Sequence, residues 1–82
     1  MRLDKFLKVS RIIKRRTVAN EACDAAHVTV NGRAAKASHD VGIGDVICVS
    51  FGSRSLTVKV TGLNEHAQKA DAAGLYEVIS EQ

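Results

Sequence analysis

The first part of the chain is rich in basic side chains, and these are the residues of the sequence with the clearest capacity to bind a ligand. Residues 1–36 contain nine Lys or Arg and three Asp or Glu, a balance of +6, whereas residues 37–82 contain three and six, a balance of −3. A concentrated cationic region attracts phosphates or acidic surfaces, because a surface that serves only solubility intersperses the two signs. The basic residues in question are Arg2, Lys5, Lys8, Arg11, Lys14, Arg15, Arg16, Arg33 and Lys36.

Two short helices are expected to carry most of these charges. Leu3, Phe6 and Leu7 have the i, i+3, i+4 spacing of one apolar helix face of roughly two turns. Basic residues follow at every third position as far as Lys14, and each step of three falls about 60° short of a full helical turn. One continuous helix would therefore wrap these charges around its axis. To gather them on one side, the chain should break near Ser10 and start a second helix.

The second helix is predicted over about Arg15–Ala26. Its small apolar side chains suit close packing, and they are Val18, Ala19, Ala22, Cys23 and Ala26. The basic run Lys14-Arg15-Arg16 stands at the start of this helix, where each cation opposes the helix dipole at a cost of about 0.3 to 1 kcal/mol. Thr17 is a possible N-cap, which would shorten the helix by two residues. Local stability does not explain the basic run, whereas an anionic ligand would.

The middle of the chain predicts two hairpins. Asn31-Gly32 is the signal for a type I′ turn between Val28–Val30 and a returning arm that carries Arg33 and Lys36. After a turn-rich connector, alternation predicts two more strands, with Ile47, Val49 and Phe51 on one face of the first and Leu56, Val58 and Val60 on one face of its partner.

The end of the chain returns to helical spacing. Ala72, Leu75, Tyr76 and Ile79 predict a C-terminal helix from about Lys69 to Ser80, although "LYEVI" could instead be an edge strand.

Composition argues against several classes of function. A chain of 82 residues fits one small domain, and without a nucleophile elbow or a metal-ligand cluster we expect no enzyme, no cofactor and no metal. No apolar run reaches about 18 residues and no cleavable leader is visible, so we expect a cytoplasmic protein without a membrane partner. Cys23 and Cys48 form no C-x-x-C pair and are expected to be structural thiols or bystanders. The three histidines are expected to be ordinary surface or turn residues.

A nucleic-acid backbone suits a cationic surface built from two helices and a hairpin arm, although a solvated basic face would share the composition. Proteins that grip single strands stack bases on aromatic side chains. The aromatic residues of this chain, Phe6, Phe51 and Tyr76, all lie on faces that the predicted core needs. Structured RNA recognised by shape, phosphates and 2′-hydroxyls is therefore the better fit.

Three stretches of the sequence resemble a known family. "RLDKFL", "SRIIKRRTVANEACDAAHVTVNGRAAKAS" and "VGIGDVICVSF" are similar to the S-four RNA-binding domain over about residues 1–60. The resemblance implies an α+β fold in which two short N-terminal helices pack on a small antiparallel sheet and bind folded RNA along the helical side. We expect this domain to span residues 1–62, with residues 63–82 as a helical tail packed on it.

The whole chain is similar to short stand-alone bacterial members of this family that act in ribosome quality control. That resemblance implies a monomer that binds obstructed large ribosomal subunits, contacts 23S ribosomal RNA and peptidyl-tRNA, and supports an RqcH-like tailing factor in adding alanine to the stalled chain. Two alternatives stay open: a heat-shock-type protein that recycles blocked large subunits, and a basic protein-interaction module.

The resemblance also implies roles for single residues. Arg16 is the strongest RNA contact candidate, Arg2 is expected to meet RNA, and Asp4 to orient nearby basic side chains, although Asp4 could instead be a helix-start residue. The resemblance implies that Arg11, Lys14 and Arg15 line the same groove. The full set of candidate RNA-binding residues is Arg2, Asp4, Lys5, Lys8, Arg11, Lys14, Arg15, Arg16, Arg33 and Lys36. The chain departs from its relatives at Ala25-Ala26, where a glycine is common, and at Arg15, where Ser or Thr is common.

Overall fold

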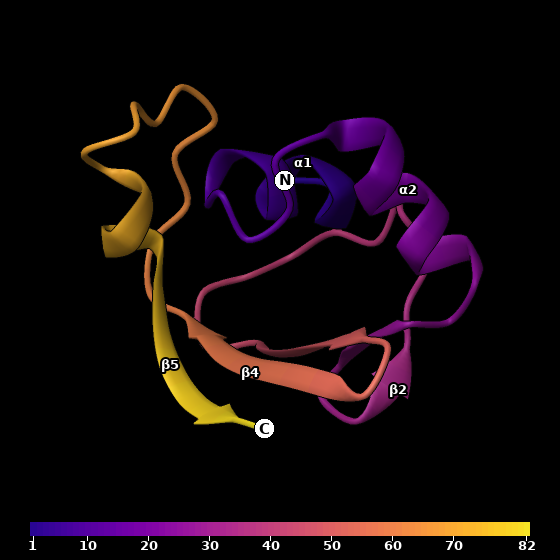
Figure 1. Ribbon diagram of the computed structural model, residues 1–82. Coiled ribbons are helices and arrows are strands. Elements are labelled where there is room, and N and C mark those ends of the chain that lie inside the picture. Colours follow the sequence, from indigo (N-terminus) through magenta and orange to yellow (C-terminus); the bar gives the residue numbers. More distant parts are fainter.

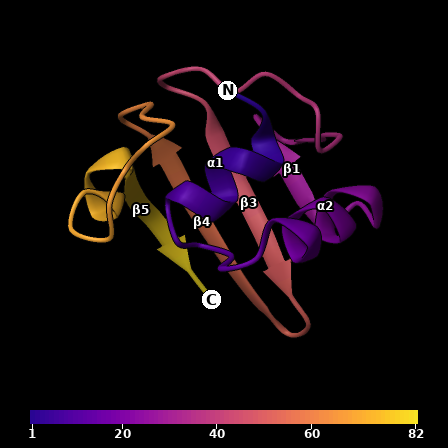
Figure 2. The same cartoon turned by 90° about the horizontal axis from the view of Figure 1, so that it is seen from above.

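Two helices cover one face of a five-stranded antiparallel sheet in the computed structural model, which describes residues 1–82 (Figures 1 and 2). The helices are α1 (Leu3–Val9) and α2 (Arg16–Asp24), and the strands are β1 (Val28–Val30), β2 (Arg33–Ala34), β3 (Val46–Phe51), β4 (Arg54–Val60) and β5 (Tyr76–Glu81). The strand order is β2-β1-β3-β4-β5, and a 3-10 turn, η1 (Ala72–Leu75), precedes β5. The predicted fold class of two helices on a small antiparallel sheet is confirmed. Neither the length nor the composition of these helices fits a membrane span.

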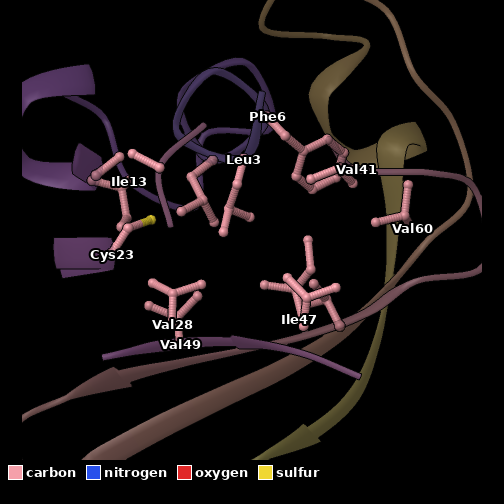
Figure 3. Close-up of a cluster of buried hydrophobic side chains, with 14 of the residues drawn as sticks. Leu3, Phe6, Ile13, Cys23, Val28, Val41, Ile47, Val49 and Val60 are labelled. Atoms are coloured by element: carbon pink, nitrogen blue, oxygen red, sulfur yellow. The ribbon is translucent and has the colours of Figure 1, made fainter. Parts of the chain in front are cut away.

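The core lies between α1 and the sheet. Leu3, Phe6 and Leu7 are fully buried, as their helical spacing predicted. They pack with the inward-facing residues of the central strands in one cluster. Figure 3 shows Leu3 and Phe6 directed toward Val28 and Ile47 in the space between the layers. This packing fixes the rotation of α1, so the polar positions of the helix are held on the outer surface.

The chain breaks after α1, as the charge pattern predicted. Ser10 is the C-cap, and its buried hydroxyl donates a hydrogen bond to the carbonyl of Leu7 at 3.3 Å. Arg11 then adopts a left-handed backbone with φ of 65°, which turns the chain toward α2. Ile13, in the connection, is buried in the core.

Helix α2 is shorter than predicted at both ends. It begins at Arg16 with Arg15 as the N-cap, so the predicted N-cap role of Thr17 is wrong, because Thr17 already lies inside the first turn. Ala19 and Cys23 are buried, whereas Val18 is 46% exposed and does not share the core face. The apolar face of α2 is therefore narrower than its composition indicated.

The two predicted hairpins are present. Asn31 and Gly32 have φ of 53° and 84°, as a type I′ turn requires, and Val30 pairs with Arg33 across them. The second hairpin pairs β3 with β4, and the residues predicted to share a face lie opposite one another, with Ile47 across from Val58 and Val49 across from Leu56. Phe51 is an exception: it is 45% exposed, because it lies at the last residue of β3, where the strand runs into the turn.

The predicted C-terminal helix is wrong, and the alternative edge strand is correct. Only η1 is helical, and β5 pairs antiparallel with β4, with Tyr76 opposite Val60. Gly62 allows the two segments to approach, because a Cβ at this position would lie 3.2 Å from the carbonyl oxygen of Gly74. The backbone groups of the β4 edge, which a helix would leave without partners, bond to β5.

Candidate nucleic-acid interface

The N-terminus is pinned to the connector before β3. The α-ammonium of Met1 lies 2.7 Å from Asp40 Oδ1, the amide of Leu3 donates to the carbonyl of His39 at 2.8 Å, and the amide of Val41 donates to the carbonyl of Met1 at 2.8 Å. These contacts hold Arg2 at the start of α1, beside the N-terminal end of α2.

Asp4 is the centre of the candidate interface. Its side chain is 2% exposed, and its carboxylate accepts hydrogen bonds from Arg2 Nε at 3.1 Å, Arg16 Nε at 3.3 Å and Asn20 Nδ2 at 3.4 Å. The backbone amide of Lys5 donates a further bond at 2.8 Å. One carboxylate therefore joins the start of α1 to one side of α2.

The pKa of Asp4 reflects two opposing effects. Burial alone would raise this pKa, but the hydrogen bonds from Arg2, Arg16, Asn20 and the Lys5 amide together lower it below its ordinary value of 3.8. Asp4 is therefore ionised at neutral pH. No buried side-chain nitrogen or oxygen atom lacks a hydrogen-bond partner.

Two guanidinium groups share this single carboxylate, so Arg2, Arg16 and Asp4 together carry a positive charge, and Glu21 places a second carboxylate in the surrounding hollow. The side chains of Arg2 and Arg16 are 50% and 46% exposed, so each keeps donors that face solvent. They line an open hollow together with Asp4, Thr17, Asn20 and Glu21. We call this the Asp4 hollow. A hollow of this kind can bind an anion such as a phosphate through oriented guanidinium donors.

A second group of predicted residues lies apart from the Asp4 hollow. Lys8, Arg11 and Lys14 line a groove beside the loop of residues 65–68, and Lys5 pairs with Glu65 of this loop, with 3.8 Å between Nζ and Oε2. Arg15 is exposed at the N-cap of α2.

The hairpin residues of the predicted set belong to neither group. Lys36 lines a separate hollow with Cys23, Asp24, Ala34 and Ala35, and Arg33 is exposed on the edge strand β2.

Several residues in these hollows were not foreseen from the sequence. Asn20 could have been found, because it lies four positions after Arg16 and therefore on the same side of the helix. His66 and Gln68 of the loop could not, because their approach to α1 depends on how the C-terminal segment folds back.

Cys23 contributes to the core and not to the interface. Burial, followed by the nearby charges of Asp4 and Asp24, raises the pKa of this thiol to about 11. The thiol stays protonated at neutral pH, and Figure 3 shows its sulfur directed toward the apolar cluster. Both Cys23 and Cys48 are free thiols.

Comparison with known proteins agrees with the motifs in the sequence. A family model described as the S4 domain matches residues 1–47, and this is the S-four RNA-binding domain that the motifs resemble. The RQC P-site tRNA stabilizing factor of Streptococcus pneumoniae is 54% identical over 81 residues, which cover 99% of this chain and 92% of that protein. The factor of the same name from Bacillus subtilis is 50% identical over 82 residues, covering 100% of this chain and 95% of that protein.

The fold also has a close match among solved structures. Heat Shock Protein 15 of Vibrio cholerae, solved as a trimer, superimposes with a TM-score of 0.90 at 31% identity, over 98% of this chain and 82% of that one. The predicted similarity to short bacterial members of the family is therefore confirmed.

Proposed function

The chain belongs to the S4 domain family, and from this membership and the Asp4 hollow we propose that it is a non-enzymatic RNA-binding protein of ribosome quality control. Its relatives are named for stabilizing tRNA in the P site, and we propose the same ligand here. In this role the protein acts at ribosomes in the cytoplasm.

The observation that carries the proposal is the shared carboxylate between Arg2 and Arg16. Two half-exposed guanidinium groups are held 3.1 and 3.3 Å from Asp4, and a guanidinium has the planar fork of donors that suits phosphate oxygens. Arg15, which pairs with no carboxylate, also stands at the start of α2, where a cation is repelled by the positive end of the helix dipole. A bound phosphate offsets this repulsion.

The finer proposal concerns the complex in which this RNA is bound. We propose that the protein binds, as a monomer, large ribosomal subunits that carry peptidyl-tRNA, contacts both 23S ribosomal RNA and the tRNA, and supports an RqcH-like factor in alanine tailing. The similarity to quality-control relatives over the whole chain supports this assignment.

Sedimentation with large subunits tests the proposal. Arg16→Glu should abolish co-sedimentation, because it removes one guanidinium from the Asp4 hollow and adds a third carboxylate to those of Asp4 and Glu21. Arg16→Gln should weaken co-sedimentation without adding charge beside Asp4, which separates a binding defect from misfolding. Unchanged co-sedimentation of both variants would remove Arg16 from the site.

A matched control is available on another part of the molecule. Arg54 is exposed at the turn between β3 and β4 and belongs to none of the predicted binding residues. Arg54→Glu makes the same change in net charge as Arg16→Glu and should leave co-sedimentation intact.

The similarity to a heat-shock protein favours a second candidate, in which the chain recycles blocked large subunits. Analysis of stalled chains in a deletion strain distinguishes the two, since only the quality-control role predicts loss of alanine tails. A protein-interaction module would instead give complexes that survive nuclease treatment in a pull-down.

A further inference from the structure

A second basic groove lies between the C-terminal end of α1 and the loop that leads to η1. Lys8, Arg11 and Lys14 form one wall, and Glu65, His66 and Gln68 form the other. A neighbouring hollow continues past Arg11 and Lys14 to Lys69. Figures 1 and 2 both show the orange loop beside this end of α1. We call the two hollows together the loop groove.

The loop wall is held by its own contacts. Asn64 Oδ1 accepts a hydrogen bond from the amide of His66 at 3.0 Å, and the carbonyl of Asn64 accepts one from the amide of Ala67 at 3.2 Å. Ala67 is partly buried against the core. The ion pair between Lys5 and Glu65 ties the same loop to α1. The groove is therefore defined by the fold on both sides.

Arg11 occupies an unfavourable backbone conformation at the centre of the groove. Its φ of 65° is uncommon for a residue other than Gly, Asn or Asp, and it is fixed by hydrogen bonds from the Arg11 amide to the Lys8 carbonyl and from the Ile13 amide to the Leu7 carbonyl, both at 3.0 Å. Glycine would relieve this conformation, but it would remove a guanidinium from the groove. Strain of this kind concentrates at binding sites.

The charge of the loop groove is strongly positive. Lys8, Arg11, Lys14 and Lys69 contribute four cations, and all four side chains are exposed. The carboxylate in the lining is Glu65, which already pairs with Lys5. The residues of the loop wall lie beyond residues 1–47, which match the S4 domain, so this wall is an addition to the part that defines the family.

We infer that the loop groove binds the phosphate backbone of a second RNA segment, separate from the segment at the Asp4 hollow. This inference rests on the proposed function, since it requires that the protein binds folded RNA. Four cations and an imidazole suit consecutive phosphates, and the loop groove shares no lining residue with the Asp4 hollow. Two separate contacts allow a small domain to join two RNA segments that lie side by side.

Site-specific photo-cross-linking to large ribosomal subunits that carry peptidyl-tRNA tests the inference. A photoreactive residue is placed at Gln68, which lines the loop groove, or at Thr17, which lines the Asp4 hollow. We expect both positions to give RNA products that map to different segments. Products from Thr17 alone, or products from both positions on the same nucleotides, would overturn the inference and leave the proposed function standing. Loss of products from both positions would overturn the proposed function together with the inference.

A charge reversal gives a second, independent readout. Lys69→Glu should lower the Gln68 product by about fivefold or more and leave the Thr17 product within about twofold, because only phosphates near the loop lose a cation. Lys69→Arg should restore the Gln68 product, and Arg54→Glu serves as the control for net charge. An unchanged Gln68 product in Lys69→Glu would overturn the role of the loop wall.

Discussion

Asp4 shows how one buried carboxylate can organise a basic surface without neutralising it. It accepts bonds from Arg2 and Arg16, which lie fourteen positions apart in the chain, yet each arginine remains about half exposed. A fixed guanidinium loses less conformational entropy when it meets a phosphate than a free one does. Asp4 is therefore a positioning residue for the two arginines.

Replacing Asp4 with Asn should therefore affect both stability and binding. We expect Asp4→Asn to lower the free energy of unfolding by about 1 to 3 kcal/mol at pH 7, because charge-assisted hydrogen bonds to two partly exposed arginines are weakened. RNA affinity should also fall, even though the net positive charge rises, since the arginines lose their orientation. Urea denaturation and a binding titration measure the two effects.

The pH dependence of this difference identifies Asp4 as its source. The pKa of Asp4 lies below 3.8 in the folded protein, so its stabilisation is complete above that pH and is lost as the pH falls through the folded pKa. The stability difference between Asp4→Asn and the unmodified protein should be constant from about pH 7 to 5 and shrink below about pH 4. A difference that persists undiminished at pH 3 would rule out the carboxylate as its cause.

The two ends of α2 depart from ideal helix chemistry for different reasons. At the start, Arg15 is an N-cap without a side-chain hydrogen bond, and Arg16 follows it against the dipole. At the end, the amide of Ala26 donates to the Cys23 carbonyl at 3.0 Å and the amide of His27 donates to the Ala22 carbonyl at 2.9 Å, which is a Schellman motif with alanine where glycine is usual.

A substitution at the start of α2 should raise the stability of the protein and lower its affinity for RNA. Arg15→Asp supplies a capping oxygen and removes a misplaced cation, so we expect a gain of about 1 kcal/mol, which raises the melting temperature by about 4 to 8 °C in a domain of this size. RNA affinity should fall in the same variant. Arg15→Ala, which lacks the capping oxygen, should gain less stability, and equal gains in both variants would contradict the capping argument.

A substitution at the end of α2 should raise the stability of the protein without lowering its affinity for RNA. Ala26 has φ of 61°, a conformation that glycine adopts without steric cost. Ala26→Gly should therefore stabilise the protein by about 0.5 to 1 kcal/mol and leave RNA binding unchanged. Thermal melts measure the change in stability, and co-sedimentation measures binding. A destabilised Ala26→Gly variant would show that the turn is not strained.

Elements fixed by local chemistry could be predicted from the sequence, and elements fixed by distant partners could not. The apolar spacing of Leu3, Phe6 and Leu7 and the turn at Asn31-Gly32 are local signals, and both gave the correct structure. The residues of β5 have helical spacing, but the open edge of β4 pairs with them as a strand. The spacing of apolar residues in the C-terminal segment gives no information about the unpaired backbone groups at the edge of β4.

The same limit applies to the candidate interface. The sequence indicated which residues are basic and that they adjoin, and the family resemblance implied that Asp4 orients basic side chains, but neither identified Arg2 and Arg16 together as its partners. It also gave no sign that the loop around His66 would form a wall beside Lys8. The assignment of residues to separate hollows depends on tertiary structure.

At the scale of the whole molecule, the uneven distribution of charge gives the protein two electrostatic sides. The N-terminal residues with a balance of +6 form both helices and the first hairpin, whereas the remainder has a balance of −3. A protein with a net charge of +3 is therefore drawn to RNA with its helical side first. Affinity should depend on how many phosphates this side neutralises.

Salt titration measures that number. If about four to six phosphates are neutralised across the Asp4 hollow and the loop groove, log affinity should fall against log salt concentration with a slope of roughly −3 to −5. Arg16→Gln and Lys69→Gln should each reduce the magnitude of the slope by about one, because each removes one phosphate contact, whereas Arg54→Gln should not change it. A flat salt response in the unmodified protein would mean that phosphates are not its ligand. An equal change in all three variants would mean that net charge, and not the two hollows, determines the attraction.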